Sequence, residues 1–319
     1  MTEDAGAFQH HGLVLPSGYD TPKVPIMTQR DLSKVVTAHR QLEGAGFAVY
    51  RPFPSASLEM LDPFLMLDEK EPTDYPPGEA KGAPDHPHRG FETVSYVLEG
   101  ETEHMDSLGN HGLIRQGEVQ WMTAGDGIIH SEMPSQKIRT EGGRVHGFQL
   151  WVNLPANQKR ATPRYQAITA DQIPVVEGDR WKAIVIAGEL FGVRGPANTH
   201  TPICYSHIAV EATASLDLAL PVDHQIGLYV FRGSGLLGAN QTPIEEHEMA
   251  MFEPSHGTVR VSGSSDHSLT EILLMAGKPI GEPVARYGPF VMNSQSEILE
   301  AIEDFEAGRM GKIAATGTA

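Results

Sequence analysis

The sequence predicts an all-β protein composed of two β-barrels. Its 33 glycines and 23 prolines are spread along the 319 residues, a composition typical of many short strands joined by turns. Apolar runs of strand length recur in both halves of the chain and are bounded by glycine. A chain of this length can form two domains of ordinary size or one large β domain, and the spacing of the runs favours two barrels.

The N-terminal part of the chain leads from a polar extension into the first barrel. Residues 1–36 are polar, and we expect them to form either a flexible extension or a strap over the barrels. Apolar residues become frequent from Phe47, and Leu61–Leu67 is predicted to be a buried strand. Residues 70–85 contain four prolines together with glycine and charged residues, so they predict a loop rather than a helix.

Two short motifs follow, 44 residues apart: His86-Pro87-His88 and His130-Ser131-Glu132. The first precedes the apolar run Thr93–Leu98, which ends at a glycine turn. The second follows a Gly-Asp-Gly turn and two isoleucines. Both motifs therefore lie at the start of, or within, β-type runs flanked by glycine turns, which is how a small barrel forms a site in its mouth.

Each motif can direct two ligand-type side chains into one cavity, because residues i and i+2 of a strand share a face. Three imidazoles and the Glu132 carboxylate form a mixed nitrogen and oxygen donor set, which suits Fe(II), Mn(II), Ni(II), Cu(II) or Zn(II). Four protein ligands leave open positions on a six-coordinate ion. With 15 histidines in the chain, one such pair is more often part of a surface strand, but the strand and turn context favours a metal site.

The second half of the chain predicts another barrel. Its strands are expected in four apolar segments: Trp181–Ala187, Ile203–Val210, Ile226–Phe231 and Ile272–Met275. None of the histidines in this half begins a His-x-His or His-x-Glu pair, and Glu245 with His247 lacks a second motif. We therefore expect no second metal site and interpret six histidines as surface or turn residues: His200, His207, His224, His247, His256 and His267.

Residues 294–308 predict a short C-terminal helix. Ser294 is followed three residues later by a glutamate, which is a capping-box pattern. Three apolar residues then recur at helical spacing, and Gly308 lies near the end. The preferred interpretation is an amphipathic helix that packs on its own barrel, and the alternative is a helix that docks a partner.

Several residues beside the motifs are candidates for specific roles. Arg89 is expected to be an ion-pair partner, and Asp126 is a candidate to orient a histidine by a hydrogen bond. His104 and His111 lie in a turn region, where solvated histidines are commoner than ones that reach a cavity. Four apolar residues are expected either to line a cavity for a flat aromatic substrate or to belong to the core: Phe91, Met122, Met133 and Phe148.

The charge and the cysteine count limit the partners and the compartment. With 24 basic and 41 acidic residues the formal net charge is −17, so no direct nucleic-acid binding through a broad basic surface is expected. The single cysteine, Cys204, excludes an intramolecular disulfide and fits a reducing compartment. The acidic N-terminus lacks a signal-peptide pattern, and no apolar run reaches about 18 residues, so we expect a cytoplasmic protein without a membrane-spanning helix.

At these motifs the chain resembles the pirin family of the cupin superfamily. The resemblance extends over about residues 37–312 and is strongest between 84 and 155. A series of segments in a fixed order is far more specific than any one motif. The shared segments are LDPFLMLDE (61–69), HPHRGFETVSYVLEG (86–100), EHMDSLGNHG (103–112), GEVQWMTAGDGIIHSEMP (117–134), GFQLWVNLP (147–155), PRYQ (163–166) and FVMNSQSEILEAIEDFEAGRMG (290–311).

The resemblance implies a bicupin, that is, two antiparallel β-barrels of the double-stranded β-helix or jelly-roll type, with a short C-terminal helix. The implied domains are an N-terminal extension (1–36), a metal-binding barrel (37–160), a barrel without metal (161–289), and a helix with a tail (290–319).

The resemblance also implies the ligands of the metal. In cupins generally the carboxylate position is that of Glu92, whereas in pirins the carboxylate follows the third histidine by two residues. We therefore favour Glu132 as the ligand and expect Glu92 to pack around the ligands, although either carboxylate remains open from the sequence. The ligand positions of the family fall on His86, His88, His130 and Glu132.

Finally, the resemblance implies an activity. Pirins usually hold iron, several cleave quercetin-type flavonols with O2, and others are regulators that bind protein partners. We expect one divalent metal, Fe(II) before copper, nickel, manganese or zinc, and a quercetin 2,3-dioxygenase in which Glu132 takes the hydroxyl proton of a flavonol as general base. The alternative is a metal- or redox-sensing regulator that binds a protein partner without turnover. A metal-free barrel that binds a sugar or another small ligand ranks last.

Overall fold

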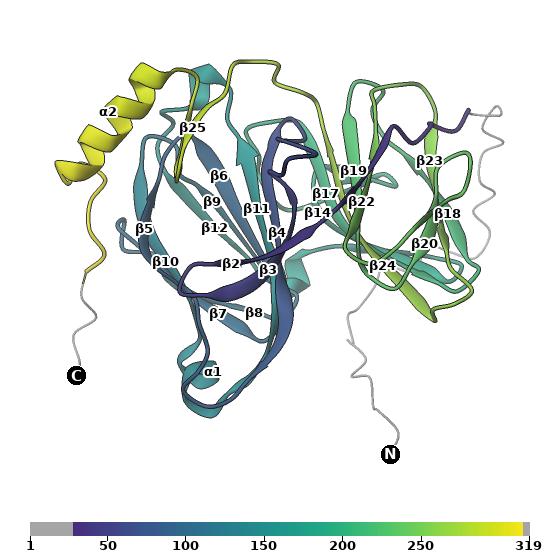
Figure 1. The fold of residues 1–319 in the computed structure, drawn as a ribbon, viewed down its shortest axis with the longest axis horizontal. Coiled ribbons are helices and arrows are strands. Elements are labelled where there is room, and N and C mark those ends of the chain that lie inside the picture. Colours follow the sequence, from purple (N-terminus) through teal and green to yellow (C-terminus); the bar gives the residue numbers. More distant parts are fainter. Residues whose placement is uncertain (1–27, 315–319) are drawn as a thin grey trace.

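The structure is a computed structural model in which residues 28–314 are described. Two β-barrels lie side by side, and a helix lies on the outer side of the N-terminal barrel (Figure 1). Within the described residues the α-helices are α1 (Gln136–Glu141) and α2 (Gln295–Glu306), and the remaining elements are mainly strands. The predicted all-β fold of two antiparallel β-barrels with a short C-terminal helix is therefore confirmed.

The N-terminal barrel consists of a large and a small antiparallel sheet. The small sheet contains both histidine motifs, and β5 is one of its edge strands. The large sheet has the order β12 (Arg164–Ile168), β9 (Val119–Thr123), β6 (Phe91–Glu99), β11 (Gly143–Asn153), β4 (Phe64–Tyr75), β3 (Phe47–Phe53) and β2 (His39–Glu43). The small sheet has the order β5 (Ala83–His88), β10 (Ile128–Pro134), β7 (Glu101–Asp106) and β8 (His111–Arg115).

The C-terminal barrel repeats this arrangement, and its strands include all four apolar segments that the sequence predicted. Its large sheet has the order β1 (Lys34–Thr37), β22 (Glu248–Phe252), β19 (Gln225–Arg232), β24 (Leu269–Gly277), β17 (Ile203–Glu211), β14 (Trp181–Ala187) and β13 (Val175–Gly178). Its small sheet has the order β18 (Ser215–Ala219), β23 (Thr258–Gly263), β20 (Gly235–Leu237) and β21 (Thr242–Ile244). Two short hairpins complete the fold: β15 (Glu189–Leu190) with β16 (Val193–Arg194), and β25 (Ala285–Tyr287) with β26 (Phe290–Met292).

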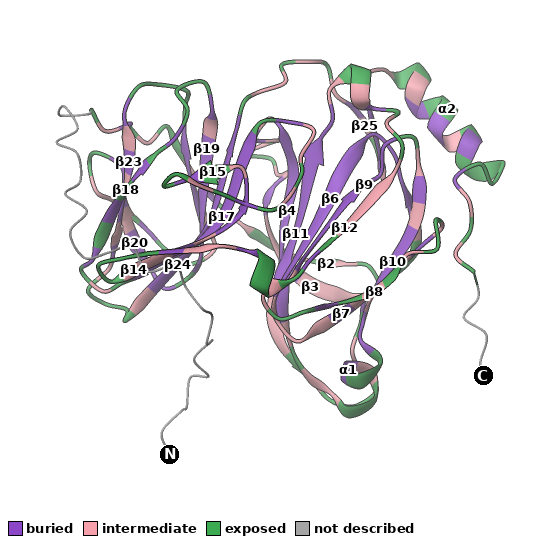
Figure 2. Ribbon diagram, turned by 180° about the vertical axis from the view of Figure 1, so that it is seen from behind, coloured by how far each residue is buried: buried purple, intermediate pink, exposed green. Residues whose placement is uncertain are grey.

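The largest hydrophobic core lies between the barrels, where the two large sheets face each other. Both sheets contribute buried aromatic and aliphatic residues to one cluster, including Tyr96, Trp121 and Phe148 from one barrel and Tyr229 and Phe231 from the other. Figure 2 shows the corresponding strands as mostly buried. A second apolar cluster fills the C-terminal barrel. The interior of the N-terminal barrel, by contrast, contains buried polar residues, and these form the site.

Two strands lie outside the ranges predicted for their domains. β12 follows residue 160 yet pairs with β9 of the N-terminal barrel. β1 overlaps the predicted extension yet pairs with β22 of the C-terminal barrel. The buried Arg30 side chain, just before β1, donates to carbonyl oxygens of that barrel at 2.8 and 2.9 Å. The described part of the extension is therefore a strap on the C-terminal barrel, while residues 1–27 lie outside the described residues.

The prediction of a loop over residues 70–85 is wrong at both ends of this range. β4 continues to Tyr75, and β5 begins at Ala83. Pro72 is accommodated because it falls where the register between β4 and β11 shifts, so no regular ladder hydrogen bond is needed there. Pro84 is accommodated because β5 is an edge strand.

The predicted C-terminal helix is confirmed as α2. The Ser294 hydroxyl accepts a hydrogen bond from the Glu297 backbone N–H, so Ser294 is the N-cap. The helix packs its buried residues on the β25–β26 hairpin, in a cluster that includes Phe290, Ile298 and Ala301. It therefore packs within this chain, as the amphipathic pattern indicated, but on the N-terminal barrel and not on the C-terminal barrel that precedes it in sequence (Figure 1). No helix among residues 28–314 is long and apolar enough to cross a membrane.

Candidate metal centre

The three motif histidines meet inside the N-terminal barrel. His86 and His88 share one face of β5, and His130 of β10 is the cross-strand partner of His86. The Nε2 atom of His86 lies 3.0 Å from that of His88 and 2.9 Å from that of His130. All three candidate ligand nitrogens lie within 4.8 Å of one another. Strand alternation thus brings these residues together as the spacing predicted.

The three nitrogens have the spacing that one metal ion requires. Metal–imidazole bonds are about 2.0–2.1 Å long, so two of them at right angles hold their nitrogens about 3 Å apart. The observed separations of 2.9 and 3.0 Å match this spacing. The three-histidine cluster in this barrel therefore indicates a site for a single metal ion.

The surroundings favour the neutral form of His88 and His130 and orient His86. Burial lowers the pKa of His88 well below the ordinary value, and the imidazoles of His130 and His86 lower it further. Burial and then His86 lower the pKa of His130 in the same way. The Nδ1 atom of His86 lies 2.7 Å from the carbonyl oxygen of Pro84, to which it can donate. This tautomer leaves the Nε2 lone pair of His86 free to bind a metal.

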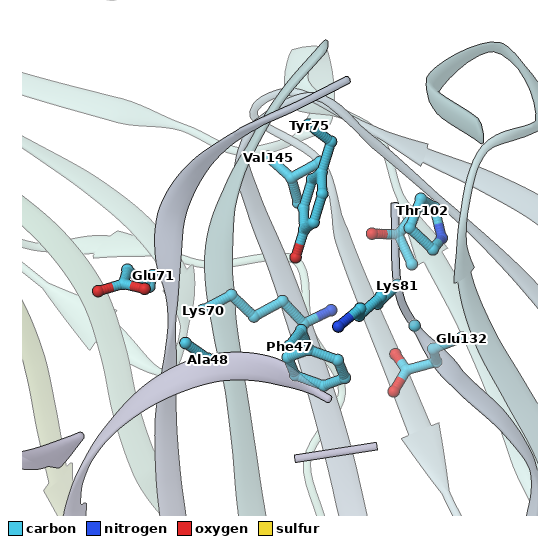
Figure 3. Close-up of a pocket in the computed structure, with 11 residues that line it drawn as sticks. Phe47, Ala48, Lys70, Glu71, Tyr75, Lys81, Thr102, Glu132 and Val145 are labelled. Carbon is cyan, nitrogen blue, oxygen red and sulfur yellow. The ribbon is translucent and has the colours of Figure 1, made fainter. Parts of the chain in front are cut away.

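Glu132 lies farther along β10, beyond an irregularity in the β5–β10 register. Its side chain is buried, and its Oε1 atom accepts a hydrogen bond from the Ser95 hydroxyl of β6. The Ser95 Oγ atom also lies 2.7 Å from the side-chain amide of Gln149. Glu132 also lines a pocket of about 20 Å³ together with residues of β3, β4 and β7 (Figure 3). The carboxylate is thus held on the interior side of the barrel, and its role as fourth ligand stays a prediction.

Glu92 does not pack around the histidines as expected. On β6, Phe91 contacts the His88 ring at 5.0 Å between centroids and Ser95 contacts Glu132, so the odd-numbered side chains face the interior. Glu92 points the other way, where Thr123 donates to its Oε1 atom at 2.7 Å. Burial raises the pKa of the Glu92 carboxyl. Strand alternation therefore removes Glu92 from the candidate ligands.

The predictions for the neighbouring charged and aromatic residues have mixed outcomes. Arg89 forms the expected ion pair, with its Nη1 atom 2.7 Å from Oδ2 of Asp304. Asp126 contacts no histidine in the described structure. Its exposed carboxylate instead accepts a hydrogen bond from the Arg160 side chain at 2.7 Å. Phe148 faces the C-terminal barrel rather than the site.

His104 is a buried neighbour of the site that sequence reasoning missed. It is fully buried, with Nδ1 2.9 Å from the Gln120 amide and a ring centroid 5.5 Å from that of His130. The prediction of a solvated loop histidine is therefore wrong. The alternation of buried residues along β7 places His104 opposite Glu132 on β10. Burial alternates along residues 102–106 but hydrophobicity does not, so the sequence held no clear indication that His104 is buried.

The β25–β26 hairpin, which follows the C-terminal barrel in the sequence, covers the site. The carbonyl oxygen of Pro289, in the hairpin turn, lies 3.4 Å from Nδ1 of His88. Gly90 has a φ of +90°, and a Cβ atom there would lie 2.0 Å from the carbonyl oxygen of Val291. The buried Lys159 ammonium donates to the carbonyl oxygens of Gly90 and Val291, at 2.8 Å each, which fastens the hairpin to the turn after His88. Burial lowers the pKa of Lys159 to about 7.

Two histidines of the C-terminal barrel are buried, although the sequence predicted that they are surface or turn residues. His207 and His224 are buried, and His207 lies 3.0 Å from the Tyr96 hydroxyl of the other barrel. His247 is in a turn, but its Nδ1 atom lies 3.0 Å from Oε2 of Glu69 across the interface. His207 and His247 belong to the contact between the barrels.

Comparison with known proteins agrees with this architecture. The pirin family model matches residues 46–152, and the model of the pirin C-terminal cupin domain matches residues 205–311. Pirin-like protein 2 of Arabidopsis thaliana is 42% identical over 286 residues, which cover 88% of this chain and 86% of that protein. Pirin of Rattus norvegicus is 39% identical over 279 residues, which cover 86% of this chain and 92% of that protein.

Among solved structures, a quercetin 2,3-dioxygenase from Acinetobacter baumannii is similar over 90% of this chain and 100% of its own, with a TM-score of 0.84 and 36% sequence identity. The two family models together match more than half of the chain, and the relatives are similar over most of it, so this chain belongs to the pirin family.

Proposed function

We propose that this protein is a mononuclear metal-dependent dioxygenase that cleaves quercetin-type flavonols with O2. The observation that carries the proposal is the convergence of three imidazole nitrogens within 4.8 Å, in a barrel interior that also holds the buried Glu132. Similarity to a quercetin 2,3-dioxygenase over nine-tenths of the chain supports the reaction class. In this proposal the N-terminal barrel is the catalytic unit, and the protein acts in the cytoplasm, as the sequence predicts.

The resident metal in this proposal is Fe(II), held by the three histidines with Glu132 as fourth ligand. Sites that combine histidine with one carboxylate and keep open positions suit non-haem iron oxygenases, although copper, nickel, manganese and zinc bind similar donors. When bound, the ion supplies Lewis acidity and open positions for substrate and oxygen. Imidazole ligands carry no negative charge, so Glu132 would supply the one negative charge of this donor set.

Glu132 is the proposed general base for the flavonol hydroxyl. The Ser95 hydroxyl donates to Oε1, which fixes the carboxylate and leaves Oε2 to accept the substrate proton. Phe91 and Trp151 lie with ring centroids 5.0 and 5.1 Å from that of His88 and pack against it. Their rings exclude water from that side of the site.

The first experiment measures oxygen uptake with quercetin by the Fe(II)-loaded protein, with metal content quantified on every sample. We expect His88→Ala to lose both the metal and the uptake, because one of three imidazoles is removed. His111→Ala is the matched control, since His111 is exposed and pairs with Glu103 rather than with the cluster. Absence of bound metal in the parent protein after loading with several ions would contradict the metal centre.

A second variant separates metal binding from proton transfer. Glu132→Gln should retain metal on the three histidines but lose uptake by about 10²–10⁴-fold, because the amide cannot accept the proton. Full turnover of Glu132→Gln with metal bound would show that Glu132 is not the base. Stoichiometric iron in the parent protein without uptake would instead support a regulator that binds a protein partner.

A further inference from the structure

The β25–β26 hairpin carries an arginine that packs on an aromatic ring of the site. The Arg286 side chain of β25 lies over the Trp151 ring of β11, with its Cζ atom 4.8 Å from the ring centroid. The Trp151 ring in turn packs edge-on against His88, with 5.1 Å between the ring centroids. Figure 1 shows β25 at the end of the N-terminal barrel, next to α2. One indole ring therefore separates the Arg286 guanidinium from a candidate metal ligand.

Trp151 belongs to the interior face of the N-terminal barrel. It lies two residues after Gln149, whose side chain is 2.7 Å from the Ser95 hydroxyl inside the barrel. Alternation along a strand places the side chains of Gln149 and Trp151 on the same face. Arg286 thus packs on a residue whose side chain faces the same interior as the histidine cluster.

The Arg286 guanidinium has no acidic partner among residues 28–314. None of the salt bridges within 4.0 Å and none of the side-chain hydrogen bonds in this part of the chain includes it. The nearby carboxylates of Asp68 and Glu43 pair instead with Arg51, at 2.6 and 2.8 Å. Burial lowers the pKa of Arg286, and the charge of Arg51 lowers it further. The half-buried guanidinium is thus a cation whose N–H donors are not used by the described part of the chain.

A guanidinium in this position suits a flat ligand that is rich in oxygen. A cation–π contact needs only the positive charge, so the contact with Trp151 leaves the N–H groups of Arg286 free to donate. Two such groups side by side match two adjacent oxygens, and neighbouring hydroxyl groups on an aromatic ring provide that pair. A half-buried cation gains more from such acceptors than an exposed one, because fewer water molecules compete for its donors.

We propose that Arg286 is a specificity-determining residue that binds hydroxyl oxygens on an outer ring of a flavonol. The adjacent hydroxyl and carbonyl groups of a flavonol lie on its central ring and suit the metal, so the outer rings extend away from the metal. Arg286, one indole ring away from His88, is placed to meet an outer ring. It would select flavonols with hydroxyl groups on the outer rings, such as quercetin, over the parent compound 3-hydroxyflavone, which lacks them. The inference rests on the proposed function and narrows its substrate class.

The test is a titration of the Fe(II)-loaded full-length protein with quercetin and with 3-hydroxyflavone under anaerobic conditions, where binding is measured without turnover. We expect quercetin to bind the parent protein at least about tenfold more tightly than 3-hydroxyflavone. Arg286→Met should weaken quercetin binding by about tenfold and change 3-hydroxyflavone binding by less than about twofold. Arg286→Lys should recover only part of the loss, because an ammonium keeps the charge but lacks the planar pair of donors.

Oxygen uptake gives a second readout. Arg286→Met should raise the KM for quercetin by about tenfold with little change in kcat, because the lost contact is made equally in the ground state and the transition state. Two variants are matched controls and should change neither affinity. Tyr287→Ala alters the next residue of the same hairpin, whose side chain is exposed. Arg194→Met removes one positive charge from an exposed position on β16.

Equal losses for both flavonols in Arg286→Met, or loss of its bound metal, would mean that Arg286 only supports the hairpin and would overturn the proposal. Unchanged quercetin binding in this variant would also overturn it. The comparison of the two flavonols on the parent protein needs no variant, so equal or weaker binding of quercetin there overturns the proposal even if Arg286→Met does not fold. Quercetin binding that depends on Arg286 without any oxygen uptake would reject the dioxygenase and not the role of Arg286.

Discussion

At the scale of single residues, the site depends on which face of a strand each side chain occupies. Alternation along β5 and β10 brings three imidazoles together, and the same rule turns Glu92 away from them. Ser95 faces the interior and holds Glu132 in place. One hydroxyl thus links the large sheet to the strand that carries the third histidine.

This link leads to a prediction for Ser95→Ala. The three histidines are untouched, so the variant should retain its metal, but oxygen uptake with quercetin should fall by about tenfold because Glu132 loses the group that orients it. Metal analysis and initial rates measure the two effects. Ser131→Ala is the control, since the Ser131 hydroxyl is buried on β10 next to Glu132 and has no hydrogen-bond partner in the described structure. Equal losses in the two variants would argue against an orienting role.

The residues of the site were predictable to different extents. His86, His88 and His130 could be predicted because the i, i+2 relation is local and needs only that each segment is a strand. The face of Glu92 depends on how β6 closes into the barrel, and the burial of His104 depends on the register between β7 and β10. Both are long-range pairings that a single sequence does not contain.

At the scale of elements, the C-terminal hairpin and α2 act as a cover for the strand that carries His88. The sequence predicted α2 because its cap and its apolar spacing are local patterns. It did not predict the β25–β26 hairpin, whose strands have three residues each and are too short to show a period. The hairpin is defined by its contacts with Arg89, which pairs with Phe290 in a β-bridge.

The contact between α2 and Arg89 predicts a stability effect. The Arg89 side chain is 3% exposed, and Asp304 of α2 lies 2.7 Å from it. Asp304→Asn should lower the free energy of unfolding by about 2–3 kcal/mol, because it leaves a buried guanidinium without its nearest carboxylate. Glu300→Gln, on the same helix and in an exposed pair with Arg160, should cost less than about 1 kcal/mol. Urea unfolding measures both values, and similar losses would show that burial of the Arg89 pair is unimportant.

At the scale of the whole molecule, the two barrels are joined by a core that contains buried polar groups. Glu69 of β4 accepts from the Tyr229 hydroxyl at 2.7 Å and lies 3.0 Å from Nε2 of His146 and from Nδ1 of His247. The sequence did not indicate this network, because the outer face of each large sheet is covered by the other sheet. His207 lies inside a continuous apolar run, which is typical of a strand buried on both faces, and this was the indication that it is not a surface residue.

The network around Glu69 makes the stability of the contact between the barrels depend on pH. Burial disfavours the charge of His247, but the hydrogen bond and the charge of Glu69 outweigh burial and raise the pKa of His247 above 6.5. Burial likewise disfavours the Glu69 carboxylate, but its bonds to His146 and His247 outweigh burial and lower its pKa below 4.5. A raised histidine pKa contributes stability that is complete below the unfolded pKa of about 6.5 and is lost as the pH rises through the folded pKa. The Glu69 contribution is present above about pH 4.5 and is lost as the pH falls through its folded pKa.

The last prediction concerns His247→Asn, which suits the φ of +64° at this position. The variant should be less stable than the parent protein by about 1 kcal/mol near pH 6, and the difference should shrink as the pH rises through the raised pKa of the parent histidine. Unfolding curves of both proteins at each pH give this difference directly. His256→Asn, at an exposed position of the same barrel, should show no difference over the same pH range. A constant gap between His247→Asn and the parent protein across this range would mean that packing, rather than the charge pair with Glu69, accounts for the contribution of His247.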